Sequence, residues 1–188
     1  MEKVADVLVK KMLSHSLIDS ADTKIYAYGI KNLIYIGINF LWAVCLAVYF
    51  GKYIEILVFI CTFMILRSYA GGLHCRKKFC FLLSNIIIIL PIFIEIKNSF
   101  TVLVCILISM AEIAFLSPME NQNKILSQDE AIRYKKNVYK ILIICLGLLI
   151  IMLNLRCFPI YSSIGLAILM VCLLQILNVL KKAIEKLR

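Results

Sequence analysis

One histidine and two cysteines, His74, Cys75 and Cys80, lie close together in a basic stretch of the chain. The nucleophilic form of cysteine is the thiolate, and a neighbouring imidazole can generate it. Cys80 also begins a long apolar run, so we expect it near the N-terminus of a helix, where unpaired amide groups and the helix dipole favour an anion. These residue types indicate a cysteine nucleophile, Cys80, with His74 as its general base.

Other interpretations of this stretch stay open. His74 could be a solvated loop residue, and Cys80 could merely begin an apolar helix. Gly71 and Gly72 would let the backbone turn sharply just before the histidine. A metal site is disfavoured, because His74, Cys75 and Cys80 supply three ligands and no second cluster offers a fourth. We therefore expect neither a metal nor a cofactor.

The elements that position these residues follow from composition. The chain has 188 residues, of which 63% are hydrophobic, whereas soluble domains contain about 45–50%. A membrane-spanning helix needs about 20 predominantly apolar residues. The net charge of +10 is carried between apolar runs, unlike the basic surface of a soluble nucleic-acid binder. We expect an all-α polytopic membrane protein that contacts the lipid bilayer and binds no nucleic acid.

The apolar runs predict six transmembrane helices in a single domain, residues 1–188. The predicted spans are about residues 33–50, 54–66, 80–96, 100–116, 138–155 and 157–180. The N-terminal segment, residues 1–24, contains an amphipathic pattern that suits a helix on the membrane surface, or equally a cap packed on the other helices. Residues 67–79 and 117–137 are predicted to be the two large loops.

The distribution of Lys and Arg supports this map. With the N-terminus in the cytoplasm, 18 of the 21 basic residues fall on the cytoplasmic side, and only Lys52, Lys97 and Arg156 fall outside. Cytoplasmic loops normally carry such an excess. The bias predicts that both termini are cytoplasmic and that His74 and Cys80 face the cytoplasm.

Two polar residues inside the predicted spans could assist. Glu112 lies one turn from the cytoplasmic end of its span, and an intramembrane carboxylate is costly and by default a functional candidate. It could orient His74 or pair with Arg67, although a structural pair with a lysine is an alternative. Ser84, one turn after Cys80, is a further hydrogen-bonding candidate.

Two segments carry a family resemblance. Residues 67–74 read Arg-Ser-Tyr-Ala-Gly-Gly-Leu-His, and residues 80–84 read Cys-Phe-Leu-Leu-Ser. Together they resemble the signature of the accessory gene regulator B (AgrB) family, bacterial membrane cysteine endopeptidases that process quorum-sensing propeptides. Residues 22–29 and 117–126 also resemble segments of that family, so the resemblance covers essentially the whole chain.

The resemblance implies roles for individual residues. Cys80 matches the nucleophile and His74 its general base, while Arg67 and Gly72 fall on positions that the family needs for activity. By the same resemblance, the substrate is a short AgrD-like autoinducer propeptide that is cut near its acidic C-terminal tail. The new C-terminal carbonyl would form a thioester on Cys80, and an internal Cys or Ser would then close a thiolactone or lactone. The expected location is the bacterial cell membrane, and a homodimer is plausible for so small a bundle.

The chain departs from the family pattern at one point, because five residues rather than six separate His74 and Cys80. On a continuous helix, at about 100° per residue, a six-step offset would put the two side chains about 120° apart. Either the helix begins after His74, or residues 76–79 form an irregular turn. The shorter spacing also makes Cys75 a competitor for the role of nucleophile.

Two other classes of protein remain in competition. A small transporter or channel subunit that exports a peptide or ion would explain the polytopic plan and Glu112, but the chain lacks the repeated broken helices that many transporters use. A non-catalytic membrane scaffold would leave residues 67–84 unexplained.

Overall fold

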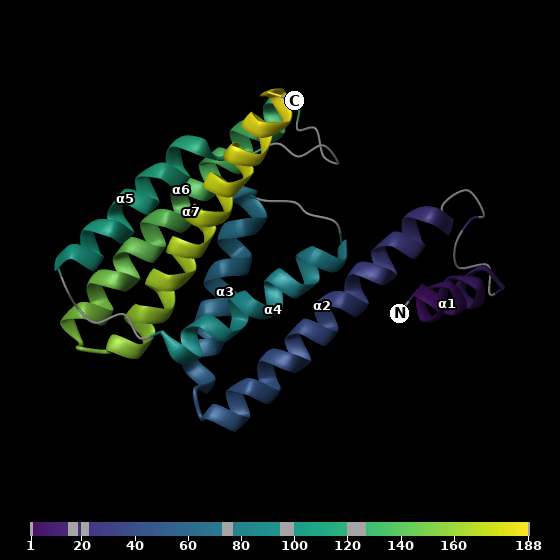
Figure 1. The fold of residues 1–188 in the computed structure, drawn as a ribbon, viewed down its shortest axis with the longest axis horizontal. Helices are drawn as coiled ribbons and strands as arrows, with labels where there is room; N and C mark the ends of the chain where they lie inside the picture. The colour runs from purple at the N-terminus through teal and green to yellow at the C-terminus, as the bar shows by residue number, and fades with distance from the viewer. Residues whose placement is uncertain are drawn as a thin grey trace. The chain divides into compact units, whose positions relative to one another are not determined.

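The computed structural model of the chain describes residues 2–14, 19, 23–72, 77–94, 100–119 and 127–187. All regular structure in these ranges is helical, which confirms the all-α prediction. Figure 1 shows the seven helices that the described residues form. In chain order they are α1 Glu2–Ser14, α2 Thr23–Phe50, α3 Tyr53–Ala70, α4 Lys77–Phe93, α5 Phe100–Leu116, α6 Gln128–Asn154 and α7 Phe158–Leu187.

The helices gather into two compact units, Met1–Leu46 and Ala47–Arg188. The first unit contains α1 and most of α2. α1 covers most of the predicted amphipathic segment, and it buries Val9 while Val7 and Leu8 stay exposed. A helix in this segment is therefore confirmed, and its place on a membrane surface stays a prediction.

Four helices of the described chain are long and apolar enough to cross a membrane, namely Ile25–Phe50, Tyr53–Ala70, Gln128–Asn154 and Phe158–Glu185. α4 and α5 have 17 residues each. At 1.5 Å per residue such a helix rises about 26 Å, slightly less than the hydrocarbon core of about 30 Å. Each predicted span falls on one of the helices α2 to α7. The number of spans, six, and the cytoplasmic termini stay predictions.

In the second unit, α7 is the central helix. It packs against α3, α4, α5 and α6, and Figure 1 shows it side by side with α5 and α6. Eight consecutive residues of α7, residues 161–168, are buried. Large apolar side chains of the neighbouring helices complete the core, among them Phe59, Leu66 and Ile113. A polar side chain on so deeply buried a helix needs a partner or a function.

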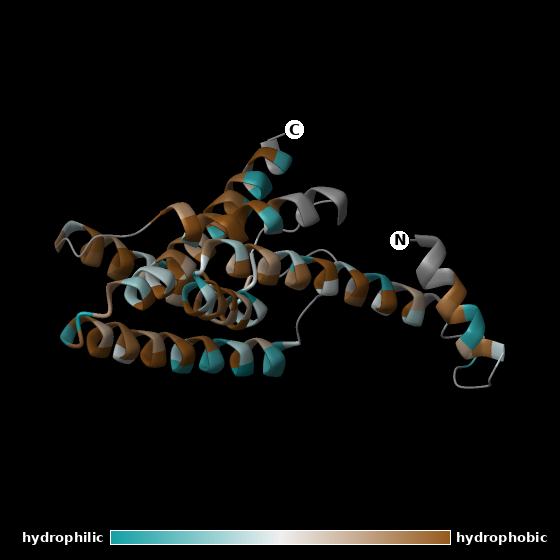
Figure 2. Ribbon diagram, turned by 90° about the horizontal axis from the view of Figure 1, so that it is seen from below, coloured by the Kyte–Doolittle hydropathy of each residue, from teal (hydrophilic) through white to brown (hydrophobic). Residues whose placement is uncertain are grey.

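The outer surface of this unit is also apolar. Figure 2 shows hydrophobic residues along the helices and hydrophilic residues toward helix ends, as at the C-terminal end of α7. Exposed side chains in the middle of α6, such as Ile143, Ile144 and Ile150, are large and apolar. Extended apolar surface of this kind is typical of a membrane contact rather than of contact with water. The surface therefore agrees with a membrane protein.

One end of the second unit is closed by short connections, two residues between α2 and α3 and three between α6 and α7. Lys52 Nζ donates a 3.0 Å hydrogen bond to the carbonyl of Ile92 in the last turn of α4. Carbonyls in that position lack partners within the helix, and a cation suits the negative end of the dipole. The rings of Phe50 and Phe93 pack edge to face nearby, with centroids 5.7 Å apart. These four residues define the closed end.

At the other end of this unit, the helices extend beyond the predicted spans. α6 begins at Gln128, so the last part of the predicted loop 117–137 is helical. The cause is a capping box, in which Ser127 Oγ accepts from the Glu130 amide at 3.3 Å and the Ser127 amide donates to Glu130 Oε2 at 3.1 Å. Such a box satisfies two amide groups at a helix start. The other predicted loop, 67–79, is also shorter than predicted, because α3 extends to Ala70 and α4 begins at Lys77.

Candidate functional site

The predicted catalytic pair lies around the start of α4. His74 and Cys75 fall outside the described residues, whereas α4 begins at Lys77, so the helix starts after His74. This is the first of the two arrangements that the shortened spacing allows. Cys80 lies in the first turn of α4 and Ser84 one turn later, although their side chains are not among the described ones. The backbone thus confirms that Cys80 is near a helix N-terminus, where unpaired amides favour a thiolate.

Arg67 lies in the last turn of α3. Its side chain is partly buried, and the guanidinium carbon is 5.5 Å from the centroid of the Phe63 ring, one turn earlier. A guanidinium over an aromatic face is held by a cation–π attraction. The predicted supporting residue is therefore ordered against its own helix, close to the point where α3 ends at Ala70.

The glycine pair after α3 has a backbone that other residues rarely adopt. Gly71 has φ 77° and ψ −163°, in a region that is essentially restricted to glycine. A Cβ on Gly71 would lie 2.7 Å from the carbonyl oxygen of Met119. Gly72 also has a positive φ, 151°, but a Cβ there would meet Leu174 at an ordinary 3.6 Å. Gly71 therefore has a stricter steric requirement for glycine than Gly72, which is the predicted site residue.

Polar groups from three distant segments meet at the end of α3. The Met119 amide donates to the carbonyl of Ala70 at 3.1 Å. Gln175 Nε2 donates to the same carbonyl and to Ser117 Oγ, both at 3.0 Å. We call these five residues, Ala70, Gly71, Ser117, Met119 and Gln175, the polar junction. It ties the beginning of one predicted loop to the beginning of the other.

Gln175 lies at the centre of this junction and is fully buried on α7. Its Oε1 atom has no hydrogen-bond partner among the described residues, and leaving such an acceptor buried costs about 1–3 kcal/mol. Interhelical bonds from glutamine are a common device between membrane helices. Gln175 is not among the site residues predicted from the sequence. The signal that could have found it was an amide within an otherwise apolar run.

Glu112 lies on the face of α5 that meets α7. Both carboxyl oxygens are buried and have no hydrogen-bond partner among the residues that the structure describes. The Cys172 side chain of α7 lies beside this carboxyl group and also beside Ser109, one turn earlier on α5. Within the same described residues, Glu112 is therefore not paired with Arg67 or with a lysine. A carboxyl group that is buried without a hydrogen-bond partner is unfavourable for stability.

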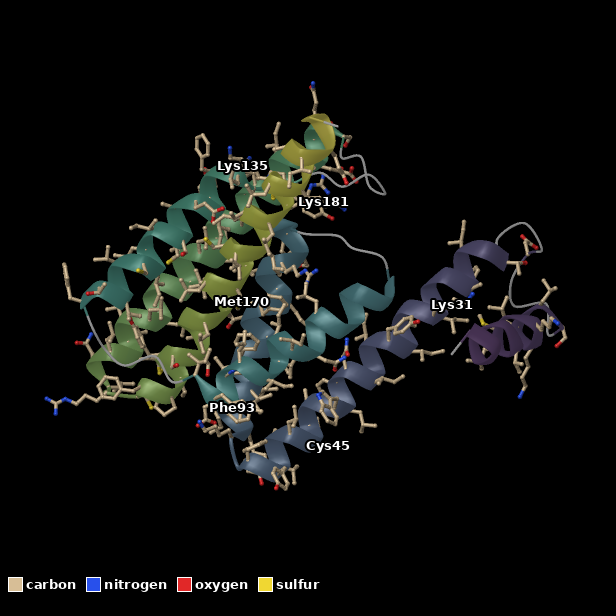
Figure 3. All side chains as sticks on the ribbon, in the orientation of Figure 1. Lys31, Cys45, Phe93, Lys135, Met170 and Lys181 are labelled. Atoms are coloured by element: carbon tan, nitrogen blue, oxygen red, sulfur yellow. The ribbon has the colours of Figure 1, made fainter. Side chains whose placement is uncertain are left out.

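Positive charge gathers at the end of the unit opposite the closed end. Figure 3 shows Lys135 of α6 and Lys181 of α7 at this end and Phe93 at the other. Further exposed basic residues on the same two segments are Arg133, Lys136, Lys140 and Lys182. Lys181 pairs with Glu185 one turn later on α7, at 3.8 Å.

Comparison with known proteins gives the family. The family described as Accessory gene regulator B matches residues 1–179. The chain belongs to the accessory gene regulator B family. This confirms the family named from the sequence motifs, and it agrees with a membrane protein.

Two relatives of this accessory gene regulator B protein come from Clostridium perfringens. "Putative AgrB-like protein 2" of strain 13 / Type A is 32% identical over 100 residues, which are 53% of this chain and 47% of the relative. The chain thus matches about half the length of that relative. "Putative AgrB-like protein" of strain SM101 / Type A is 27% identical over 189 residues, 94% of this chain and 86% of the relative. No solved structure matches.

The described part of this family member offers no group of three or more His, Cys, Asp and Glu side chains that could hold a metal ion. The side chains of His74, Cys75 and Cys80 are not among the described ones. The described residues define two features that precede and follow the histidine in the sequence: the polar junction, whose Gly71 lies three positions before His74, and the helix start that carries Cys80.

Proposed function

We propose that this accessory gene regulator B protein is a membrane cysteine endopeptidase that processes a short AgrD-like autoinducer propeptide. The observation that carries the proposal is the start of α4 at Lys77, which puts Cys80 in a first helical turn directly after the histidine segment. Family membership supports the substrate class. The chain would act as one integral membrane domain.

The reaction would proceed by two acyl transfers. His74 removes the proton from the Cys80 thiol, and the sulfur attacks the carbonyl carbon before the acidic tail. The C–N bond breaks, the tail leaves as an amine that takes the proton from His74, and the peptide is held as a thioester. An internal thiol or hydroxyl of the peptide then attacks the thioester and releases Cys80, which gives a thiolactone or lactone.

Each step suits an N-terminal helical turn. The first amides of α4 have no intrahelical partner, so they can stabilise the thiolate and the oxyanion of each tetrahedral intermediate. A thioester keeps the acyl group activated, and a site bordered by the membrane keeps water from competing with the internal nucleophile. Arg67, Gly72, Glu112 and Ser84 are the supporting candidates, as hydrogen-bonding, charged or backbone-shaping residues around this turn.

The topology that fits this function has six spans, with both termini and the active site on the cytoplasmic side of the bacterial cell membrane. The gathering of basic residues at one end of α6 and α7 supports it, because positive residues mark the cytoplasmic side. The same charges would attract an acidic peptide tail. The proposal includes a homodimer, because so small a bundle could pair with a second copy of itself.

Cleavage of the propeptide by membranes that contain single variants tests the proposal. His74→Ala and Cys80→Ser should each abolish cleavage while the protein still inserts into the membrane, because each removes one half of the reacting pair. Cys75→Ser is the matched control and should keep most of the activity. Cleavage by Cys80→Ser at the wild-type rate would overturn the proposal.

A further inference from the structure

We propose that Gln175 is a positioning residue of this peptidase. It holds Ala70 and Ser117 in a fixed arrangement and thereby orients the backbone that leads to His74. The inference rests on the proposed function, since it assigns Gln175 a role in the reaction of His74 and Cys80.

The hydrogen bonds fix the orientation of the Gln175 amide. The Ala70 carbonyl can only accept, so the atom that faces it must be Nε2, at 3.0 Å. The second proton of the same nitrogen is directed to Ser117 Oγ, also at 3.0 Å. Both donors of the amide are therefore used on backbone or side-chain groups 105 and 58 residues away in sequence. An apolar residue of the same size would make neither bond.

The junction holds the backbone from Ala70 to Gly72 against its neighbours. The Ala70 carbonyl accepts from both Gln175 and the Met119 amide. Gly71 follows in a glycine-only conformation against the Met119 carbonyl, and Gly72 packs on Leu174, the neighbour of Gln175 on α7. Only one residue separates Gly72 from His74 in the sequence. A shift of Ala70 would thus displace Gly72, the last described residue before the histidine segment.

The stability of the fold alone does not explain why a glutamine is buried at position 175. Gln175 is fully buried, and its Oε1 atom has no partner among the residues that the structure describes. A buried polar group of this kind is unfavourable unless its bonds are needed. Because one bond holds Ala70, the last residue of α3 before the histidine segment, and the other ties it to Ser117, the geometry points to orientation of the site rather than to general packing.

Gln175→Met tests the assignment, because methionine keeps the side-chain length and removes both donors. The kcat for propeptide cleavage, per folded enzyme, should fall by about ten-fold or more with KM little changed, since a displacement of about 1 Å can cost about 100-fold in rate. Ser163→Ala is the control: it removes another buried polar side chain of α7, whose 3.0 Å hydrogen bond goes to the Pro159 carbonyl of the same helix, away from the polar junction. It should leave kcat close to the wild-type value.

A second measurement follows the reactivity of Cys80 in the absence of substrate. Alkylation of Cys80 by iodoacetamide is followed by mass spectrometry as a function of pH in the purified wild-type and variant proteins. His74 should make Cys80 reactive near neutral pH in the wild type, and Gln175→Met should shift the profile toward that of an ordinary thiol, with a pKa of about 8.5. A purely structural role would leave this profile unchanged in the folded fraction.

The outcomes separate the two proposals. An unchanged kcat and alkylation profile in Gln175→Met, or an equal loss in Ser163→Ala, would overturn the role of Gln175 while the inactivity of Cys80→Ser upheld the peptidase. Cleavage by Cys80→Ser would instead overturn the peptidase itself. If Gln175→Met does not accumulate, Ser117→Ala removes one of the two bonds, and Ser117→Thr keeps the hydroxyl acceptor. A loss of kcat in Ser117→Ala that Ser117→Thr restores supports the role, and equal activity in both contradicts it.

Discussion

The two ends of the second unit join their helices through different contacts. At the closed end, short connections bring neighbouring helices together, and the contacts are a lysine on a helix carbonyl and an edge-to-face aromatic pair. At the polar junction, a buried amide and backbone groups connect segments that are 58 and 105 residues apart. The polar contact at the closed end joins residues 40 apart and is only partly buried, whereas the polar contacts of the junction are fully buried inside an apolar bundle.

This difference indicates where function resides. Short connections and apolar contacts stabilise a bundle at little cost, as the closed end does. Buried polar contacts are retained in spite of their desolvation cost, most often where a precise arrangement is needed. The polar junction flanks the histidine segment, so we expect substitutions there to affect catalysis and matched substitutions at the closed end to affect stability alone.

The largest contrast is expected between two glycines, one at each end. Gly71→Ala should lower the free energy of unfolding by about 3 kcal/mol or more, because the conformation is a glycine-only one and the Cβ would lie 2.7 Å from a backbone oxygen. It should also abolish propeptide cleavage. Gly51→Ala has a φ of 66° with open space around the new Cβ, so it should cost about 1–2 kcal/mol and leave cleavage intact.

Denaturation and cleavage of the two alanine variants in the same detergent would measure this contrast. Similar losses of activity in Gly51→Ala and Gly71→Ala would show that the two ends do not differ in their relation to the site.

A smaller effect of the opposite sign is expected at Glu112. Its carboxyl oxygens are buried without a hydrogen-bond partner in the described chain. Glu112→Leu should therefore raise the free energy of unfolding by about 1 kcal/mol or more, and it should lower cleavage if the carboxyl serves the site. Gain of stability with loss of activity is typical of a functional residue. A less stable Glu112→Leu would mean that the carboxyl has a stabilising partner in the folded protein.

The helices could largely be predicted from the sequence, because continuous apolar runs and their flanking charges are local signals. The predicted span 100–116 coincides with α5. α6 starts earlier than predicted because Ser127 and Glu130 form a capping box, a signal that is readable in the sequence but was outweighed by the polarity of the segment. Cys80 near a helix start also followed from the apolar run that begins there.

The polar junction could not be predicted in the same way. A single sequence does not reveal which backbone carbonyl lies opposite a glutamine 105 residues away. The requirement for glycine at position 71 likewise depends on the approach of Met119, which is a tertiary contact. Long-range contacts of this kind have no local pattern, whereas helices do.

The most direct test of the account is to identify the residue that carries the peptide during turnover. The wild-type protein is incubated with a propeptide whose internal nucleophile is replaced by alanine, so that the acyl group cannot be released by cyclisation. Mass spectrometry should then find the peptide on Cys80, in a linkage that hydroxylamine breaks. A peptide attached to Cys75, or no covalent intermediate although the tail is cleaved, would contradict the central claim.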